Sequence, residues 1–276
     1  MFIILSQIFF GVFVFGIFAV CSIVFRRRPS NERNWSLDQE KLPRAEFGED
    51  GKILVYNVRH TSYRTTTDYA VSHYDREYDL NKLKKVWFFL IPFTGYRGAA
   101  HSFLSFEFEE GIFVSVSVEI RKKVGEKFSA KRGLFREFEL MYVVADERDV
   151  VRLRVEHHKD KVFMYPTSLT KEQGQELFRD MLARANKLAE KPEFYNTILN
   201  TCITNVVHHI NVADPGKVSV YDRRVFLPER LDEYMYERGF IDTDLSFYDA
   251  KEKHRIDMVA KEHAEHPDFS LKIRGR

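Results

Sequence analysis

The sequence predicts an α+β domain with a mostly antiparallel sheet, preceded by one apolar N-terminal helix. Two neighbouring segments, 101–108 and 112–121, alternate apolar and polar residues, as strands with one buried face do. Two later segments, which follow Thr170 and Thr201, space their apolar residues as amphipathic helices do. Strands followed by helices are typical of the α+β class.

The first 25 residues contain no charged side chain, and Arg26, Arg27 and Arg28 follow at once. At about 1.5 Å per residue, a helix over 1–25 crosses a hydrocarbon core about 30 Å thick. The segment lacks the basic start and the small-residue cleavage site of a signal peptide, so we expect an uncleaved transmembrane anchor. The three arginines behind it favour a cytoplasmic position for the rest of the chain under the positive-inside rule.

The remaining chain divides into three parts. Residues 26–45 are polar and predict a juxtamembrane linker, in which Trp35 suits the headgroup level. A catalytic domain is expected over 46–215, and a charged C-terminal extension over 216–276 is expected to pack on it. The net charge of +2 gives no indication of a nucleic-acid partner. Two cysteines far apart in the sequence, Cys21 and Cys202, predict no disulfide framework.

Segments Lys52–Arg59 and Val86–Phe93 are predicted strands, and a hairpin follows them. Its loop, Glu109-Glu110-Gly111, suits a three-residue connection that ends on a left-handed glycine. Phe108 then pairs with Ile112, which puts apolar opposite apolar along both strands, whereas a two-residue loop would misplace one apolar set. The same register puts His101 opposite Glu119 on the polar side, close enough to interact.

Three further strands are predicted, which gives a sheet of about five: Phe135–Ala145, Val150–Val155 and Val162–Tyr165. A charged turn, Asp146–Asp149, separates the first two. Thr170 and Gln173 form a capping-box pattern before the first long helix. Pro192 ends that helix, and a short helix is expected over Leu231–Arg238.

Cys202 stands where the second amphipathic helix begins, after the capping residues Asn200 and Thr201. Free N–H groups and the helix dipole favour an anion there, so we expect the pKa of the thiol to be lowered. The alternative is a small buried apolar side chain without chemistry.

A thiolate nucleophile needs a base, and the base needs a group that orients it. Cys202, His101 and Glu119 supply these three types, in the arrangement of a papain-like site whose histidine precedes its cysteine. The alternative is that His101 and Glu119 only pair on a solvated face. We expect no metal site from His208-His209 or from His263 and His266, and no cofactor.

Three arginines lie close together in the sequence: Arg148, Arg152 and Arg154. They could bind the phosphate or carboxylate of a ligand, and the alternative is that they form salt bridges within the sheet.

Several motifs together resemble the Lnb-type periplasmic domain of bacteria. They are RPSNERNW from Arg28, NVRHTSYRTTTDY from Asn57, AHSFLSFEF from Ala100, VSVEIRKKVGE from Val116, ELMYVVADERDVVRLR from Glu139, PEFYNTILNTC from Pro192 and the closing FSLKIR. The resemblance covers the chain from about residue 28 onward. It implies a fold similar to permuted NlpC-type and lecithin retinol acyltransferase-type cysteine enzymes, and a link to N-acylation of bacterial lipoproteins.

By motif, the family's histidine matches His101, its cysteine matches Cys202, and the acidic position of its S-x-E-x-R strand matches Glu119. Ser117 and Arg121 beside Glu119 are expected to support the site, as is Asn200. In the family an asparagine directly precedes the cysteine, whereas here Thr201 does and Asn200 is one residue earlier. The resemblance also implies a periplasmic domain anchored in the inner membrane, against the charge rule.

Three functions follow as hypotheses. The first is a thiol acyltransferase that moves an acyl chain from a phospholipid through a Cys202 thioester to an amine, for which the N-terminus of a lipoprotein is the expected acceptor. The second is a cell-wall cysteine peptidase or amidase that uses the same residues. The third is a membrane-anchored binding module in which Cys202 is unreactive.

Overall fold

The computed structural model describes Phe10 and residues 14–16, 18, 22, 24–66, 68–95 and 97–276. The predicted anchor over 1–25, with Cys21, lies mainly outside these residues. Among the residues that are described, no helix is long and apolar enough to span a membrane.

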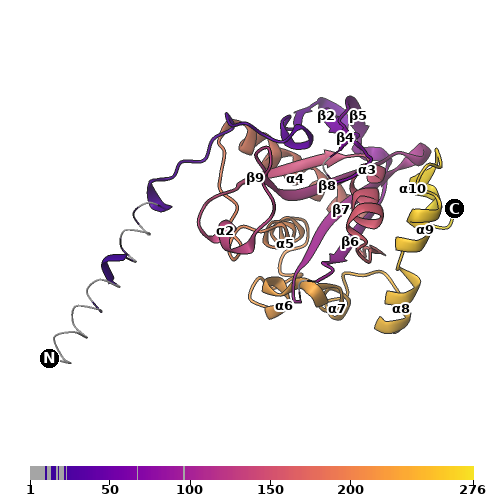
Figure 1. The fold of residues 1–276 in the computed structure, drawn as a ribbon. Coiled ribbons are helices and arrows are strands. Elements are labelled where there is room, and N and C mark those ends of the chain that lie inside the picture. The colour runs from indigo at the N-terminus through magenta and orange to yellow at the C-terminus, as the bar shows by residue number, and fades with distance from the viewer. Residues whose placement is uncertain are drawn as a thin grey trace.

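An eight-stranded, mostly antiparallel sheet forms the centre of the molecule (Figure 1). Its strands run in the order β1-β2-β9-β8-β7-β6-β10, with β5 paired to β2, and a separate hairpin joins β3 to β4. Among the described strands, the one parallel contact joins β2 to β9. The strands are β1 (Arg44–Phe47), β2 (Lys52–Arg59), β3 (Ser62–Tyr63), β4 (Tyr69–Ala70), β5 (His73–Asp79), β6 (Leu83–Pro92), β7 (Ala100–Phe108), β8 (Phe113–Arg121), β9 (Glu139–Ala145) and β10 (Phe163–Pro166).

Helices cover both faces of this sheet, and each face has its own apolar core. On one face α4 and α5 pack against Leu104, Phe106 and Val116; on the other, α3, α9 and α10 pack against Phe89 and Phe103. The helices are α2 (Ala130–Leu134), α3 (Glu147–Arg152), α4 (Lys171–Glu190), α5 (Cys202–Ala213), α6 (Arg223–Phe226), α7 (Leu231–Glu237), α8 (Phe247–Lys253), α9 (Asp257–Glu262) and α10 (Phe269–Lys272). The mixed α+β class is therefore confirmed.

The predicted hairpin register is confirmed between β7 and β8. Leu104 pairs with Val116, and the Phe108 N–H donates to the Ile112 carbonyl at 2.8 Å. Gly111 is left-handed as expected, with φ of 70°, but Glu110 is left-handed too. The paired register ends at Phe103 and Ser117, before it reaches His101.

The predicted strand Val150–Val155 is wrong. Asp146 caps α3 by accepting from the Arg148 N–H, and a π-helix over Leu153–His158 continues it. Val150, Val151 and Val155 are all buried in the second core. A short run of valines fits a buried helix as well as a buried strand, so periodicity alone could not separate the two. The estimate of five strands was also too low.

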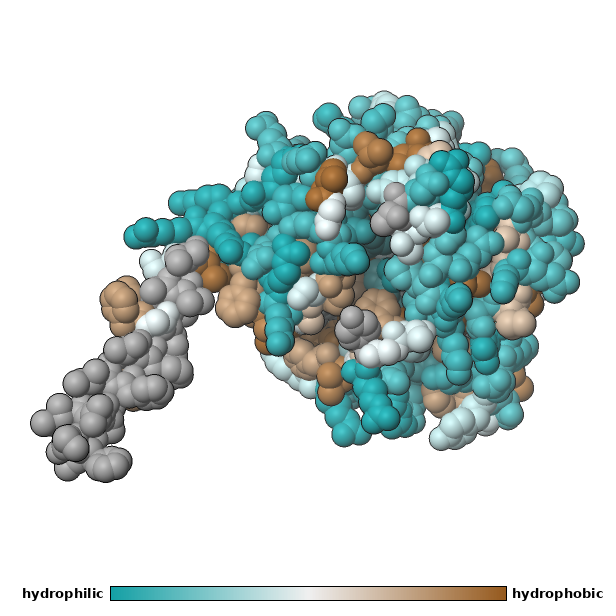
Figure 2. All heavy atoms as spheres, viewed as in Figure 1, coloured by the Kyte–Doolittle hydropathy of each residue, from teal (hydrophilic) through white to brown (hydrophobic). Residues whose placement is uncertain are grey.

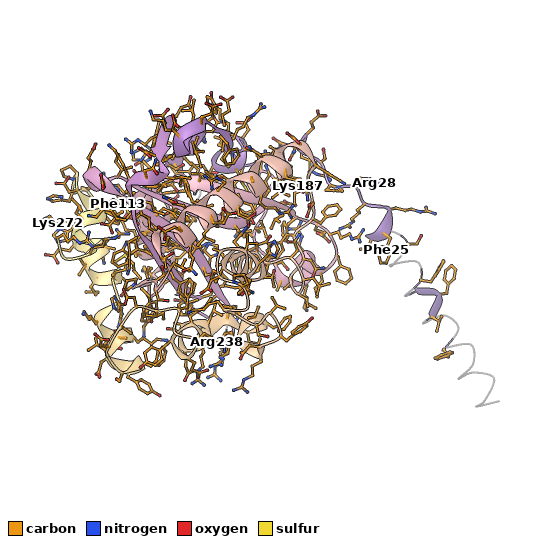
Figure 3. All side chains as sticks on the ribbon, turned by 180° about the vertical axis from the view of Figure 1, so that it is seen from behind. Phe25, Arg28, Phe113, Lys187, Arg238 and Lys272 are labelled. Atoms are coloured by element: carbon orange, nitrogen blue, oxygen red, sulfur yellow. The ribbon has the colours of Figure 1, made fainter. Side chains whose placement is uncertain are left out.

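The segment 31–41 and the C-terminal residues both bind to the sheet. Trp35 is buried under the guanidinium of Arg121, with 4.3 Å from the guanidinium carbon to the ring centroid, so it cannot reach a headgroup layer. At the other end, Arg274 forms an ion pair with Glu147 at 2.5 Å, and both side chains are fully buried. These contacts tie residues 31–41 and the C-terminus to opposite ends of the strands (Figure 3).

Gly174 of α4 is placed to test how closely this helix packs on β6. A Cβ at this position would lie 2.9 Å from Leu83 Cδ2 and 3.0 Å from Val86 Cγ2. An alanine normally stabilises a helix interior by about 1 kcal/mol, but overpacking a core costs about 1–3 kcal/mol. We expect Gly174→Ala to lower the free energy of unfolding by about 1 kcal/mol, measured by urea denaturation in detergent. Exposed Lys187→Ala on the same helix is the control; a stabilised Gly174→Ala protein would contradict the packing argument.

Candidate active site

His101, Ser117 and Glu119 form a connected polar group within the sheet. His101 Nε2 lies 2.8 Å from Ser117 Oγ, and Ser117 Oγ donates to Glu119 Oε1 at 3.1 Å. The direct distance from His101 Nε2 to Glu119 Oε1 is 3.9 Å. The two residues therefore meet as expected, but through Ser117 rather than as a directly opposed pair.

The hydrogen bonds of Ser117 fix the tautomer of His101. An ionised carboxylate can only accept hydrogen bonds, so Ser117 donates its single hydroxyl hydrogen to Glu119. The hydroxyl oxygen then accepts from His101, which requires the hydrogen on Nε2. This leaves the lone pair on Nδ1, and the imidazole can take a proton at that nitrogen.

Glu119 is held ionised although it is largely buried. Burial alone would raise the pKa of this carboxyl, but the permanent positive charges of Arg59 and Arg154, together with His101 when it is protonated, outweigh it and bring the pKa to about 2. Arg59 is itself fixed by Asp149, to which it donates at 3.0 and 2.7 Å.

Cys202 is the first residue of α5. Thr201 is the N-cap, and with Thr204 it forms a capping box at the start of this helix. The backbone N–H groups of Ser102 and Ile203 point to the sulfur and favour the thiolate. Because Ser102 directly follows His101, the thiol meets β7 beside the histidine.

The expectation of a lowered thiol pKa is wrong, because burial outweighs the helix start. Cys202 is only 9% exposed, and desolvation raises the pKa of its thiol to about 11. His101 is 4% exposed, and burial followed by the nearby Arg154 charge lowers its pKa to about 3. At neutral pH both groups are uncharged, so the resting pair is a thiol and an imidazole.

The thiol and the histidine ring approach from different sides of the sheet. Cys202 belongs to the core under α4 and α5, whereas the His101 side chain lies with Phe103 on the other face. The pairing of β7 with β8 ends at Phe103, so His101 and Ser102 lie beyond the paired part of these two strands. The charges of Arg154 and Glu119 both act on the sulfur, which places it in the same electrostatic environment as His101.

Two of the expected supporting residues bind elsewhere. Arg121 donates to the carbonyls of Gln39 and Glu40 and to Asn31 Oδ1, so it holds the N-terminal segment on β8. Asn200 donates to the Phe194 carbonyl and accepts from Asn205. It therefore shapes the loop before α5.

Sequence reasoning missed two contributors to this region. Arg154 was considered only as one of three arginines, yet its charge affects both His101 and Cys202. A buried chain also braces α5: Asp180 binds His209 Nδ1 at 2.6 Å, and His209 Nε2 meets the Tyr142 hydroxyl at 2.5 Å. The histidine doublet in the sequence was the only available signal for it.

The family model of the Lnb N-terminal periplasmic domain matches residues 70–229, more than half of the chain. The chain belongs to this family. All of the site residues from His101 to Cys202 lie inside the matched part of the Lnb domain, whereas residues 28–41 lie outside it. Comparisons with curated proteins and with solved structures found no match. Within the described part of this Lnb protein, no group of His, Cys, Asp or Glu side chains is arranged to hold a metal ion.

The raised pKa of Cys202 predicts slow alkylation. In a Cys21→Ser background, we expect iodoacetamide to modify the folded protein at pH 7.5 at least about tenfold more slowly than the urea-unfolded protein. Burial limits access, and a pKa near 11 leaves less thiolate than a pKa of 9.0. The alkylation rate should rise with pH up to about 11. Mass spectrometry of the Cys202 peptide measures this rate. A rate that levels off below pH 7 would instead indicate a preformed thiolate–imidazolium pair.

Proposed function

We propose that this protein is a membrane-associated thiol acyltransferase with a permuted papain-like site. Cys202 is the nucleophile, His101 is the base and then the acid, and Ser117 and Glu119 orient the imidazole. The observation that carries the proposal is the hydrogen-bonded order His101–Ser117–Glu119, together with a cysteine at a helix start whose sulfur meets the backbone N–H of Ser102. It combines the nucleophile, the base and the orienting group that covalent catalysis requires.

In the first half-reaction, Sγ of Cys202 gives its proton to Nδ1 of His101 and attacks the ester carbonyl carbon of a phospholipid. The ester C–O bond breaks, and the imidazolium returns the proton to the departing alcohol oxygen. The products are a lysophospholipid and a Cys202 thioester.

In the second half-reaction, an amine attacks the thioester carbonyl. His101 takes a proton from the attacking nitrogen, the C–S bond breaks, and the thiolate is reprotonated as an amide is released. An acceptor amine at the N-terminus of a lipoprotein fits, because both substrates are then confined to one membrane.

Burial of the thiol supports transfer over hydrolysis. A thioester formed in the apolar core around Cys202 is shielded from water, which competes with an amine acceptor. The neutral resting pair is consistent with this, because the sulfur becomes nucleophilic only as His101 removes its proton.

Arg154 is the best candidate for contact with the phosphate of the donor. Arg148 donates to the carbonyls of His266 and Pro267, and Arg152 pairs with Glu156 and Glu265. Arg154 stacks on Phe93 instead, and it has no carboxylate partner among the described residues.

The thioester mechanism makes a graded prediction for four substitutions. Cys202→Ala should abolish acyl transfer, and His101→Ala should lower it about 10²–10⁴-fold, since the base acts together with the nucleophile. Ser117→Ala and Glu119→Gln should cause similar, smaller losses in kcat with KM little changed, because both break one orienting chain. The measurement is transfer of labelled acyl chains from phospholipid, with mass spectrometry of lipoprotein N-termini.

Ser115→Ala is the matched control, since this buried serine on the same face of β8 has no hydrogen-bond partner for its hydroxyl among the described residues. Without acceptor, labelled phospholipid should leave a hydroxylamine-sensitive adduct on Cys202. Label that survives Cys202→Ala, or transfer without any adduct, would exclude the thioester.

The family is described as periplasmic, and we propose that the domain lies there in the cell. Alkaline phosphatase fused to the C-terminus should then be active, since it folds only outside the reducing cytoplasm. A green fluorescent protein fusion at the same point should stay dark. An inactive phosphatase fusion together with a fluorescent green fluorescent protein fusion would establish the cytoplasmic orientation that the arginines favour. It would also exclude lipoproteins as acceptors.

A further inference from the structure

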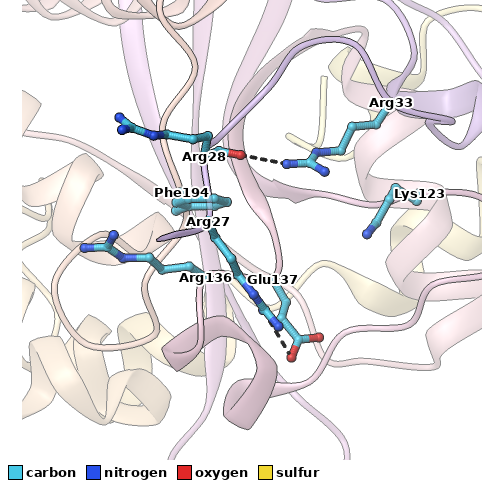
Figure 4. A pocket seen from close by; sticks show the side chains of 7 residues that line it. All are labelled: Arg27, Arg28, Arg33, Lys123, Arg136, Glu137 and Phe194. Atoms are coloured by element: carbon cyan, nitrogen blue, oxygen red, sulfur yellow. Dashed lines mark hydrogen bonds and ion pairs between the residues drawn. The ribbon is translucent and has the colours of Figure 1, made fainter. Parts of the chain in front are cut away.

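A basic cavity lies apart from the candidate active site, where the N-terminal segment joins the domain (Figure 4). Its volume is about 320 Å³, within the range of pockets that hold small ligands. Five of the seven lining residues are basic: Arg27, Arg28, Arg33, Lys123 and Arg136. Glu137 and Phe194 complete the wall.

The cavity carries more positive charge than its carboxylates neutralise. Arg27 pairs with Glu137 at 3.5 Å, and Arg33 pairs with Glu139 at 2.6 Å. Neither Arg28 nor Arg136 has a carboxylate partner among the described residues, and Arg136 instead lies over the Phe25 ring. Two guanidinium groups are therefore available to an anion.

The position of the cavity indicates where that anion comes from. Only Arg26 separates Arg27 and Arg28 from the uncharged run 1–25, so any bilayer that holds this run lies next to the cavity. Figure 3 shows Phe25 and Arg28 at one end of the molecule, and Phe113 and Lys272 at the other.

Apolar side chains are exposed around the same junction, where Figure 2 shows brown and tan surface beside the N-terminal segment. Phe135 precedes Arg136 in the cavity wall, and its carbonyl accepts from Arg27 at 2.8 Å. Leu199, which is 78% exposed, lies on the loop that carries Phe194. Apolar side chains beside a basic pocket are what a surface needs to meet acyl chains and headgroups together.

We propose that this cavity binds the phosphate of an anionic phospholipid headgroup, with Arg28 and Arg136 as its main contacts. Bound lipid holds the domain against the bilayer. The proposal does not rest on the thiol chemistry, because none of the cavity residues belongs to the catalytic group.

The cavity is nevertheless connected to that group along one strand. Arg33 binds Glu139, which pairs with Arg121, and Arg121 lies four residues from Ser117 on the same face of β8. At about 3.3 Å per residue, Arg121 lies about 13 Å along the strand from Ser117, and the cavity lies beyond Arg121. A headgroup there sets the height of the active site above the membrane.

Native mass spectrometry of the full-length protein from detergent tests the site, with phosphatidylglycerol, phosphatidylcholine and diacylglycerol as probes. We expect phosphatidylglycerol to bind most tightly, and Arg28→Ala with Arg136→Ala to weaken it about tenfold. Lys253→Ala with Lys261→Ala removes the same charge from exposed residues of α8 and α9 at the far end, and should change nothing. A Cys202→Ala protein should bind lipid as wild type does, which separates this result from the catalytic proposal.

Equal binding of all three lipids would overturn the proposal, as would unchanged binding in the Arg28 and Arg136 double variant. Inorganic phosphate distinguishes the source of the anion. If millimolar phosphate displaces the lipid completely, the cavity is a site for soluble anions and not for a membrane. If phosphate leaves phosphatidylglycerol bound and only a competing phospholipid with acyl chains displaces it, the result supports the headgroup site.

Discussion

The ionised carboxylate of Glu119 is the constraint on which the arrangement of the site depends. A buried carboxylate is stable only when positive groups and hydrogen bonds replace its water. The positive groups are Arg59 of β2 and Arg154 of the π-helix after α3, and Ser117 of β8 donates a hydrogen bond. Segments far apart in the sequence must therefore converge before this group can be charged. Gln39, which donates to Glu119 at 3.4 Å, adds the N-terminal segment to the same set.

Two opposing effects act on Cys202, and their magnitudes decide which one prevails. A helix start stabilises an anion by about 0.3–1 kcal/mol near a surface. Burial raises the pKa of this thiol from 9.0 to about 11, which corresponds to roughly 3 kcal/mol against the thiolate. The helix position thus directs the sulfur but does not ionise it. In the proposed mechanism, proton transfer to His101 accompanies attack, as it does in serine enzymes.

Local patterns made part of this structure predictable. The hairpin register followed from period-two alternation and one loop, because a shift by one residue would expose an apolar face. The capping box of Thr170 and Gln173 was likewise readable, since both partners lie within one turn. These local rules were sufficient to bring His101 and Glu119 to one place.

Long-range contacts could not be read in the same way. The pairing of Arg59 with Asp149 joins residues ninety positions apart, and neither side chain alone indicates the other. Ser117 was expected to support the site, but its position as the link between His101 and Glu119 could not be read from the alternating strand. The pKa of Cys202 was misjudged for the same reason, since burial depends on the whole packed core.

The N-terminal segment connects the basic cavity with the candidate active site. Arg121 donates to two carbonyls of this segment, and Gln39 reaches from it to Glu119. Arg33 of the same segment lines the basic cavity. The side chains that hold this segment on β8 therefore also include one that contacts the carboxylate of Glu119. Because the ring of His101 is linked to that carboxylate through Ser117, the wall of the basic cavity and the orientation of the imidazole both depend on one stretch of chain.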